Sequence, residues 1–94
     1  MRKMTVCKKK ATTDSGQTLT LVYAVTVDEL SADTLDTGIE SYGVSIAAEE
    51  MGEEVCIRHI THSSAEILTF TERISKNFVT PATLADIVHD WLLR

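Results

Sequence analysis

Long apolar runs are missing from this sequence of 94 residues. A membrane-spanning helix needs about 20 consecutive apolar residues, and no stretch of the chain comes close to that length. The first ten residues, MRKMTVCKKK, also lack the apolar core of about 7–15 residues that a secretory signal peptide carries. We therefore expect a cytoplasmic protein that has no membrane partner.

Cysteine is also scarce, and familiar catalytic motifs are absent. Cys7 and Cys56 are the two cysteines, and neither belongs to a C-x-x-C pair, so in the cytoplasm both should be reduced and unpaired. The sequence has no glycine-rich phosphate loop, no G-x-S-x-G turn around a nucleophilic serine and no H-E-x-x-H zinc motif. These absences lead us to expect no enzyme and no cofactor.

Positive charge is scarce beyond the first ten residues. Five of the nine Lys and Arg residues lie there, and from Ala11 onward four cations face fourteen acids, a balance of −10. Nucleic acid binding needs cations that contact phosphates, so most of this surface should repel nucleic acid. Lys8, Lys9 and Lys10 have another explanation, because lysines on an exposed edge strand discourage aggregation between edges. We expect no nucleic acid partner.

What is present is a 44% share of apolar residues, enough for a single domain at 1–94. Alternation at period two predicts four strands in the sheet-forming half, 1–62, at about 4–12, 18–27, 39–49 and 54–60. The clearest is TLTLVYAVTV, whose apolar face is Leu19, Leu21, Tyr23, Val25 and Val27. Asp14-Ser15-Gly16 should join the first two strands as a hairpin. Residues 28–38 read as a connection with room for one helical turn.

The helical half, 63–94, should contain two helices. Ser63 and Glu66 fit a capping box for the first helix. In the second, Thr80 is a candidate N-cap, Pro81 occupies the first position and Val79 with Leu84 fits a hydrophobic staple. The expected apolar stripes are Ile67, Phe70, Ile74 and Phe78 in the first helix, and Leu84, Ile87, Val88, Trp91 and Leu92 in the second. The second helix should be a lid that completes the core.

These elements predict an α+β fold of order ββββαα. Short turns between strands favour antiparallel pairing, and helices that follow all the strands can segregate to one side. We predict a four-stranded, mainly antiparallel sheet followed by two C-terminal helices packed on one face. Because the other face would stay uncovered, we also expect a homodimer.

Four stretches carry a resemblance to a known family: SYGVSI, GEEV, IRHIT and VTPATLADIVHDWL. With these, residues 38–93 resemble a family of small uncharacterised proteins, about 90–110 residues long and mostly from Gram-positive anaerobes. The function of that family is unknown. The resemblance therefore implies the same division into strands and helices, and it assigns no catalytic or binding residue.

One short stretch, CIRHITH at 56–62, gathers residue types that bind metals: Cys56, His59 and His62. A closed zinc site needs a fourth ligand. Side chains also alternate along a strand, so Cys56 and His62 should share one face while His59 points to the other. An apolar setting between Val55 and Ile57 favours an inert Cys56 thiol over a nucleophile. We expect no metal site here.

Two classes of function remain open. We expect a non-enzymatic cytoplasmic protein-interaction or regulatory module, with an unknown protein partner. The alternative is a small-molecule-binding module or an enzyme that uses Cys56 and His59. No catalytic, cofactor-binding or metal-binding residue is assigned.

Overall fold

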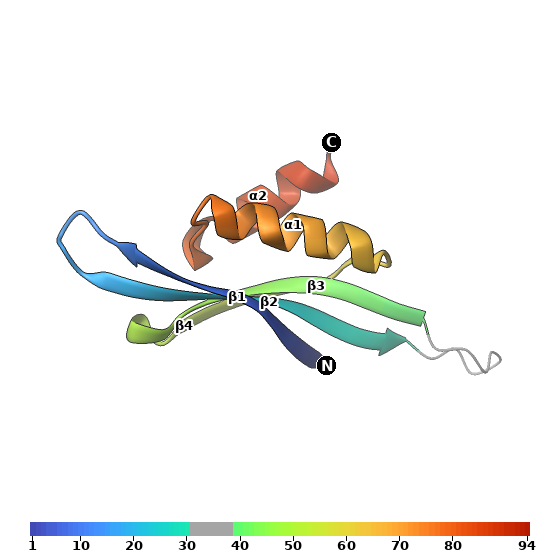
Figure 1. Ribbon diagram of the computed structural model, residues 1–94. Helices are drawn as coiled ribbons and strands as arrows, with labels where there is room; N and C mark the ends of the chain where they lie inside the picture. Colours follow the sequence, from blue (N-terminus) through green and yellow to red (C-terminus); the bar gives the residue numbers. More distant parts are fainter. Residues whose placement is uncertain (31–38) are drawn as a thin grey trace.

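Four strands followed by two helices make up the computed structural model, which describes residues 1–30 and 39–94 (Figure 1). The strands are β1 (Arg2–Thr12), β2 (Thr18–Leu30), β3 (Ile39–Ala48) and β4 (Glu53–Thr61). The helices are α1 (Ser64–Lys76) and α2 (Leu84–Leu92), with short 3-10 turns η1 (Glu49–Met51) and η2 (Pro81–Thr83). Both helices pack on one face of the sheet (Figure 1). The predicted α+β fold and its ββββαα order are confirmed.

The sheet is an antiparallel meander in the order β1-β2-β3-β4. Asp28, Glu29 and Leu30 extend β2, although we predicted that a connection begins at Asp28. That prediction is wrong because these residues pair with Ser41, Glu40 and Ile39 of β3. The rest of the predicted connection, residues 31–38, lies outside the described residues.

The core lies between the sheet and the two helices. Its side chains are Leu21, Tyr23, Val25, Val27, Val44, Ile46 and Ala48 from the strands and Ile67, Phe70, Ile74, Val79, Leu84 and Val88 from the helical half. Alternation places the strand residues on one face, and spacing of three and four places the helical residues opposite them. The Tyr23 hydroxyl donates to the backbone oxygen of Val79 at 2.8 Å, which ties the sheet to the segment between the helices.

The start of α1 keeps half of the predicted capping box. The backbone N–H of Glu66 donates to the Ser63 hydroxyl at 3.2 Å, as predicted. The return bond from the Glu66 carboxylate to the Ser63 N–H is replaced by Thr61. Its hydroxyl accepts from that N–H at 3.1 Å and donates to Glu66 at 3.1 Å. The cap therefore joins the end of β4 to the first turn of α1.

Two predicted stripe residues lie outside the core. Phe78 follows the C-cap Asn77 with a φ of 51° and is 46% exposed, because α1 ends before it. Leu92 is 54% exposed at the last position of α2. The prediction that Phe78 belongs to the packed stripe of the first helix is therefore wrong, and Leu92 lies at the exposed end of the apolar face of α2.

The second helix begins later than its cap residues suggest. Thr80 precedes η2 with Pro81 at its first position, but the Thr80 side chain caps no backbone N–H. The α-helix proper starts at Leu84. Leu84 and Val88 are buried, whereas Ile87 and Trp91 are partly buried against the core. The second helix therefore covers the core as predicted, but only part of its apolar face is fully buried.

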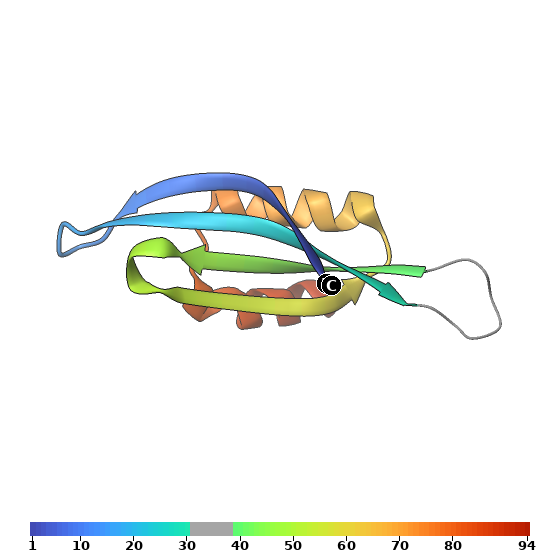
Figure 2. The same cartoon turned by 90° about the horizontal axis from the view of Figure 1, so that it is seen from below.

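Neither α1 nor α2 covers the second face of the sheet (Figure 1), but the side chains described there expose little apolar surface. A bulge between Thr5 and Cys7 bends β1, and the first residues of β1 cross below this face (Figure 2). The Lys3 ammonium reaches the carboxylate of Glu54 on β4. Side chains beneath are nearly inaccessible, with Thr26 0% and Ser45 2% exposed.

Among the residues that the structure describes, neither helix combines the length and apolarity that a bilayer-spanning helix requires.

Candidate functional site

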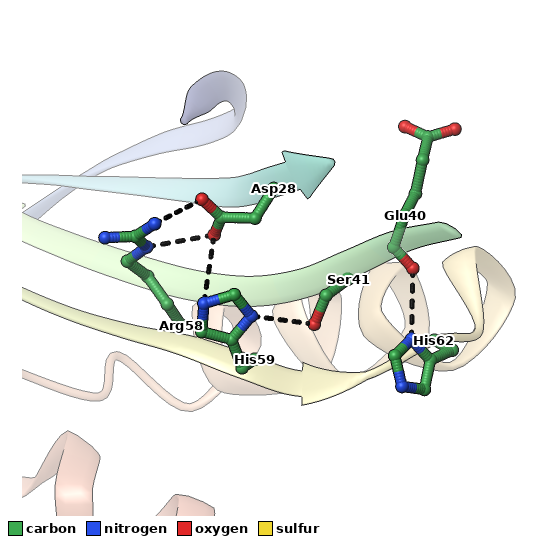
Figure 3. Close-up of polar contacts among 6 residues, drawn as sticks. All are labelled: Asp28, Glu40, Ser41, Arg58, His59 and His62. Atoms are coloured by element: carbon green, nitrogen blue, oxygen red, sulfur yellow. Dashed lines mark hydrogen bonds and ion pairs between the residues drawn. The ribbon is translucent and has the colours of Figure 1, made fainter. Parts of the chain in front are cut away.

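A cluster of polar side chains meets on the helix-free face, at one end of the sheet. Asp28 comes from β2, Ser41 from β3, and Arg58 and His59 from β4 (Figure 3). Arg58 Nε donates to Asp28 Oδ2 at 2.9 Å, and a terminal guanidinium nitrogen donates to Oδ1. His59 Nδ1 lies 3.1 Å from the Ser41 hydroxyl, and its Nε2 lies 4.0 Å from Asp28 Oδ2. Strands β2, β3 and β4 thus each contribute side chains to one cluster around the Asp28 carboxylate.

Burial is uneven within this Asp28 cluster. Asp28 is 5% exposed, whereas the side chains of Arg58 and His59 are 48% and 46% exposed. Ser41 is only 2% exposed. The negative charge therefore lies at the base of the cluster, and the groups that can donate hydrogen bonds lie at the surface.

An irregularity in β4 brings Arg58 and His59 together. Tyr42 pairs with Thr61 and Val44 pairs with Ile57, so three residues of β4 face Gly43 alone. His59 adopts a φ of 60°, which L-residues rarely do. Regular alternation would send adjacent side chains to opposite faces. The bulge overrides that alternation, and both side chains reach Asp28.

Gly43 makes this bulge sterically feasible. A Cβ at this position would lie 2.2 Å from the backbone oxygen of Ile57 and 2.7 Å from the Cα of Arg58. It would also lie 2.6 Å from the Thr26 hydroxyl oxygen. That oxygen is buried and has no hydrogen-bond partner among the described residues. The close approach of β4 to β3 therefore depends on the missing side chain.

The charges of the cluster reinforce each other. The hydrogen bonds from Arg58 hold the pKa of Asp28 below its ordinary value, and the same bonds raise the pKa of Arg58. Asp28 therefore stays ionised despite its burial. A carboxylate that is paired in this way can orient two donors without itself facing solvent.

The three residues of CIRHITH whose side chains could bind a metal have different neighbours in the structure. Cys56 pairs with Ser45, His59 contacts Ser41 and Asp28, and His62 Nδ1 lies 3.2 Å from the backbone oxygen of Glu40. The prediction that His59 faces away from Cys56 is wrong, because the bulge turns His59 to the face of Ser41. That face also carries Ser45 and its partner Cys56.

Neither cysteine has the surroundings of a nucleophile. Burial raises the pKa of the Cys56 thiol, and no hydrogen bond joins Cys56 to His59 among the described residues. Cys7 and Cys56 are both free, and their register partners Tyr23 and Ser45 point to opposite faces of the sheet. Within residues 1–30 and 39–94, no three His, Cys, Asp or Glu side chains come close enough to hold a metal ion.

A second candidate site is a groove between α1 and α2, which we call the helix groove. Two hollows of about 480 and 270 Å³ share Phe70, Arg73, Trp91 and Arg94, so they form one continuous depression. Ile74, Val79 and Ile87 complete an apolar floor that reaches the core. Phe70 and Trp91 pack with ring centroids 4.7 Å apart. His89, which Asp90 separates from Trp91 in the sequence, lines neither hollow.

Both cations and acids line the helix groove, with Asp90 and Glu66 beside the two arginines. The Arg94 Cζ lies 4.1 Å from the centroid of the Trp91 ring, and a terminal guanidinium nitrogen of Arg94 lies 3.9 Å from Glu66 Oε1. Arg73 lines both hollows and has no ion pair among the described residues. Lys76 lies beside Arg73 in an adjoining depression. Three of the four cations beyond Ala11 thus gather around this groove.

Reasoning from sequence missed both sites. The alternation of Thr26 with Asp28 could have extended β2 and placed Asp28 on the helix-free face. Gly43 in the middle of a predicted strand was a further signal of a bulge or a close backbone approach. The helix groove had no such signal, since Arg73 reads as one exposed helical residue among several.

Comparison with known proteins gives a family but no function. A family model described as a family of unknown function, DUF6514, matches residues 2–94, so the chain belongs to this family. Searches of curated proteins and of solved structures found no match. The expected membership in an uncharacterised family is confirmed, and the match also includes β1 and β2, which the resemblance left out.

Proposed function

We propose that this member of the DUF6514 family is a non-enzymatic, cytoplasmic protein-interaction module. Its helix groove would receive an amphipathic segment of a partner protein. The observation that carries the proposal is the continuous groove whose floor reaches the core and whose rim holds Arg73, a side chain with no ion pair within residues 1–30 and 39–94. An origin in Gram-positive anaerobes, which the resemblance implies, stays a prediction.

The floor of the groove suits apolar anchors. Phe70 and Trp91 offer aromatic surface, and Trp91 remains partly exposed after it packs on Phe70. Tryptophan and arginine are the residue types that most often dominate the energy of protein interfaces. One or two aliphatic side chains of a partner could bury themselves here by the helix-in-groove mode.

The rim selects the charge of the partner. Arg73 and Lys76 have no acidic partner among the described residues, while the chain as a whole carries a net charge of −5. A carboxylate at the edge of the bound segment would pair with Arg73, which has no ion pair among the described residues. We therefore propose a segment with apolar residues on one side and Asp or Glu at its border.

The alternative that uses Cys56 and His59 has less support. The thiol pKa of Cys56 is raised, which lowers its thiolate fraction. Ser41, which does contact His59, is 2% exposed and so out of reach of a substrate. A small molecule in the helix groove remains the second candidate, because 480 Å³ falls within the usual size of ligand pockets.

Site-directed photo-crosslinking in the host cell tests the proposal. A photoreactive residue in place of Thr69, which lines the groove, should capture a protein whose linked peptide contains apolar residues and an acid. The matched control is the same residue in place of Leu68, which neighbours Thr69 on α1 but lines none of the groove hollows. Arg73→Glu should abolish the link from position 69.

Several outcomes would reject this reading. Equal crosslinking from positions 68 and 69 would show a nonspecific neighbour. Links that survive Arg73→Glu would remove the charge selection. Native mass spectrometry that shows a bound metabolite, displaced by bulky substitution of Ile87, would favour the small-molecule alternative.

A further inference from the structure

We propose that Arg58 and His59, oriented by the buried Asp28, form a binding site for a phosphate-type oxyanion on the helix-free face. This inference is independent of the helix groove and concerns the Asp28 cluster of Figure 3. It rests on hydrogen-bond donors that point away from Asp28, on backbone strain and on an unpaired hydroxyl.

Arg58 has donors to spare. A guanidinium carries five N–H donors, and Asp28 accepts from the Nε and from one terminal nitrogen. Two of the five are thereby used, which leaves three on a side chain that is 48% exposed. The planar fork that remains has the geometry that binds phosphate through parallel hydrogen bonds.

His59 adds a second donor next to this fork. Its Nδ1 is held by the Ser41 hydroxyl at 3.1 Å, which orients the ring. Its Nε2 lies 4.0 Å from Asp28 Oδ2, too far for a hydrogen bond, and has no other partner among the described residues. In the protonated ring both nitrogens donate, so Nε2 can reach an anion that lies against Arg58.

The charges around the cluster determine where an anion could bind. The carboxylate of Asp28 lies at the base and would repel an anion, so an anion could bind only at the surface, next to Arg58 and His59. Asp28 and Arg58 cancel, and Lys3 on the same face is paired with Glu54. The α-ammonium of Met1 also acts on Asp28. Protonation of His59 adds one further positive charge to the cluster. An anion should bind more tightly as His59 takes up a proton.

The backbone at His59 adopts an unfavourable conformation that regular strand pairing does not require. An αL conformation at a residue with a β-carbon is unfavourable by roughly 1–2 kcal/mol, and His59 adopts it with a φ of 60°. Strain of this kind concentrates at functional sites. The buried, unpaired hydroxyl of Thr26 lies beside Gly43 on the same face and is a second unsatisfied group.

Nuclear magnetic resonance of the labelled full chain tests the site. Inorganic phosphate, added at constant ionic strength, should shift the His59 ring and Arg58 Nε resonances until they saturate. Arg58→Lys keeps the charge but removes the fork, and should weaken binding at least about tenfold, the equivalent of one charge-assisted hydrogen bond. Lys10→Gln, an exposed cation of β1, is the control that should leave binding unchanged.

A substitution at position 59 isolates the second donor. Sulfate should bind more weakly to His59→Gln than to the wild type, because the glutamine amide cannot supply the charged ring donor next to Arg58. Urea unfolding of each variant verifies that it is folded, and His59→Gln preserves the test if Arg58→Lys unfolds. Shifts that never saturate, or that Lys10→Gln reduces equally, would overturn the site. Tighter binding of acetate than of phosphate and sulfate would overturn the assignment of the ligand.

Discussion

At the scale of single residues, the Tyr23 hydroxyl should make a measurable contribution to the free energy of unfolding. It is 0% exposed, and its hydroxyl donates to the backbone oxygen of Val79 at 2.8 Å. Tyr23→Phe should lower the free energy of unfolding by about 1–3 kcal/mol near pH 7, because the Val79 oxygen is left buried without a donor. Urea unfolding measures the loss. Tyr42→Phe is the control, since its hydroxyl has no hydrogen bond among the described residues.

The same tyrosine should respond to alkaline pH. Burial, helped by the nearby Cys7, raises the pKa of Tyr23 to about 12. A pKa that folding raises contributes stability that is complete below the ordinary value of about 10 and is lost as pH rises through the folded value. The difference between wild type and Tyr23→Phe should therefore shrink between pH 10 and 12. A difference that stays constant over this range would contradict the buried, protonated phenol.

Gly43 is the second residue with a sharp expectation. Gly43→Ala would place a Cβ 2.2 Å from the backbone oxygen of Ile57, and backbone cannot move aside as a flexible side chain can. Overpacking of this kind usually costs about 1–3 kcal/mol. Ser45→Ala, two residues along the same face, should cost less. Unfolding midpoints that are the same for both variants would show that β4 does not approach β3 so closely.

At the scale of elements, the end of α1 is stabilised by backbone bonds but strained at one residue. The Val79 N–H donates to Ile74 O and the Phe78 N–H to Ser75 O, which is the Schellman pattern. Its αL position normally holds glycine, yet Phe78 occupies it with a φ of 51°. Phe78→Gly should therefore be more stable than Phe78→Ala by about 1 kcal/mol. Both lose the ring that Lys9 approaches at 5.7 Å, so thermal unfolding of the pair isolates the backbone. A Phe78→Ala variant of equal stability would refute the strain.

The second helix is both a lid and a wall of the groove. Leu84 is 0% and Val88 4% exposed, whereas Trp91 is partly buried against Phe70. Trp91→Ala should cost about 2–3 kcal/mol, below the 3–5 kcal/mol of a fully buried large aromatic. Asp90→Ala should stay within about 0.5 kcal/mol. Iodide should quench Trp91 fluorescence partly in the native protein. Complete quenching together with equal unfolding midpoints would mean that α2 does not close the core.

At the scale of the whole molecule, β1 forms an edge of the sheet, as the lysine run predicted. Lys8 lies 3.5 Å from Glu49, and Lys9 lies over Phe78, so two of the three lysines also contact their own chain. Replacing Lys8, Lys9 and Lys10 with Gln should lower solubility or promote association, because an uncharged edge can pair with another strand. Light scattering would measure it. Retention of nucleic acid by the wild type, lost in the triple variant, would instead show a binding arm.

The homodimer stays a prediction, and the structure changes where it would form. The helix-free face offers little apolar surface, since Ala24 is 4% and Ser45 2% exposed beneath the Lys3–Glu54 pair. A dimer would more readily use the helix groove, whose lining is mainly apolar. Sedimentation at micromolar concentration should give the dimer mass, weakened by Arg73→Glu if the groove is the interface. A monomer mass would remove the prediction.

The sequence by itself determined the elements and their order. Alternation at period two, helical stripes and the Ser63 cap depend on neighbours within a few residues, so they are legible without coordinates. Antiparallel pairing followed from short turns, and one helical side followed from the segregation of helices after strands. The basic edge strand and the buried positions of Leu84 and Val88 were predictable on the same grounds.

Only the tertiary structure decided the two candidate sites. Asp28 gains its neighbours because β3 pairs as far as Ile39 and because β4 bulges over Gly43, and both depend on contacts between distant segments. Phe78 and Leu92 continue a stripe in sequence but lie where their helices end. Periodicity predicts which residues share a face of a strand or helix. It does not predict where the strand register shifts or where two helices leave a groove between them. Those features depend on packing between segments that are far apart in the chain.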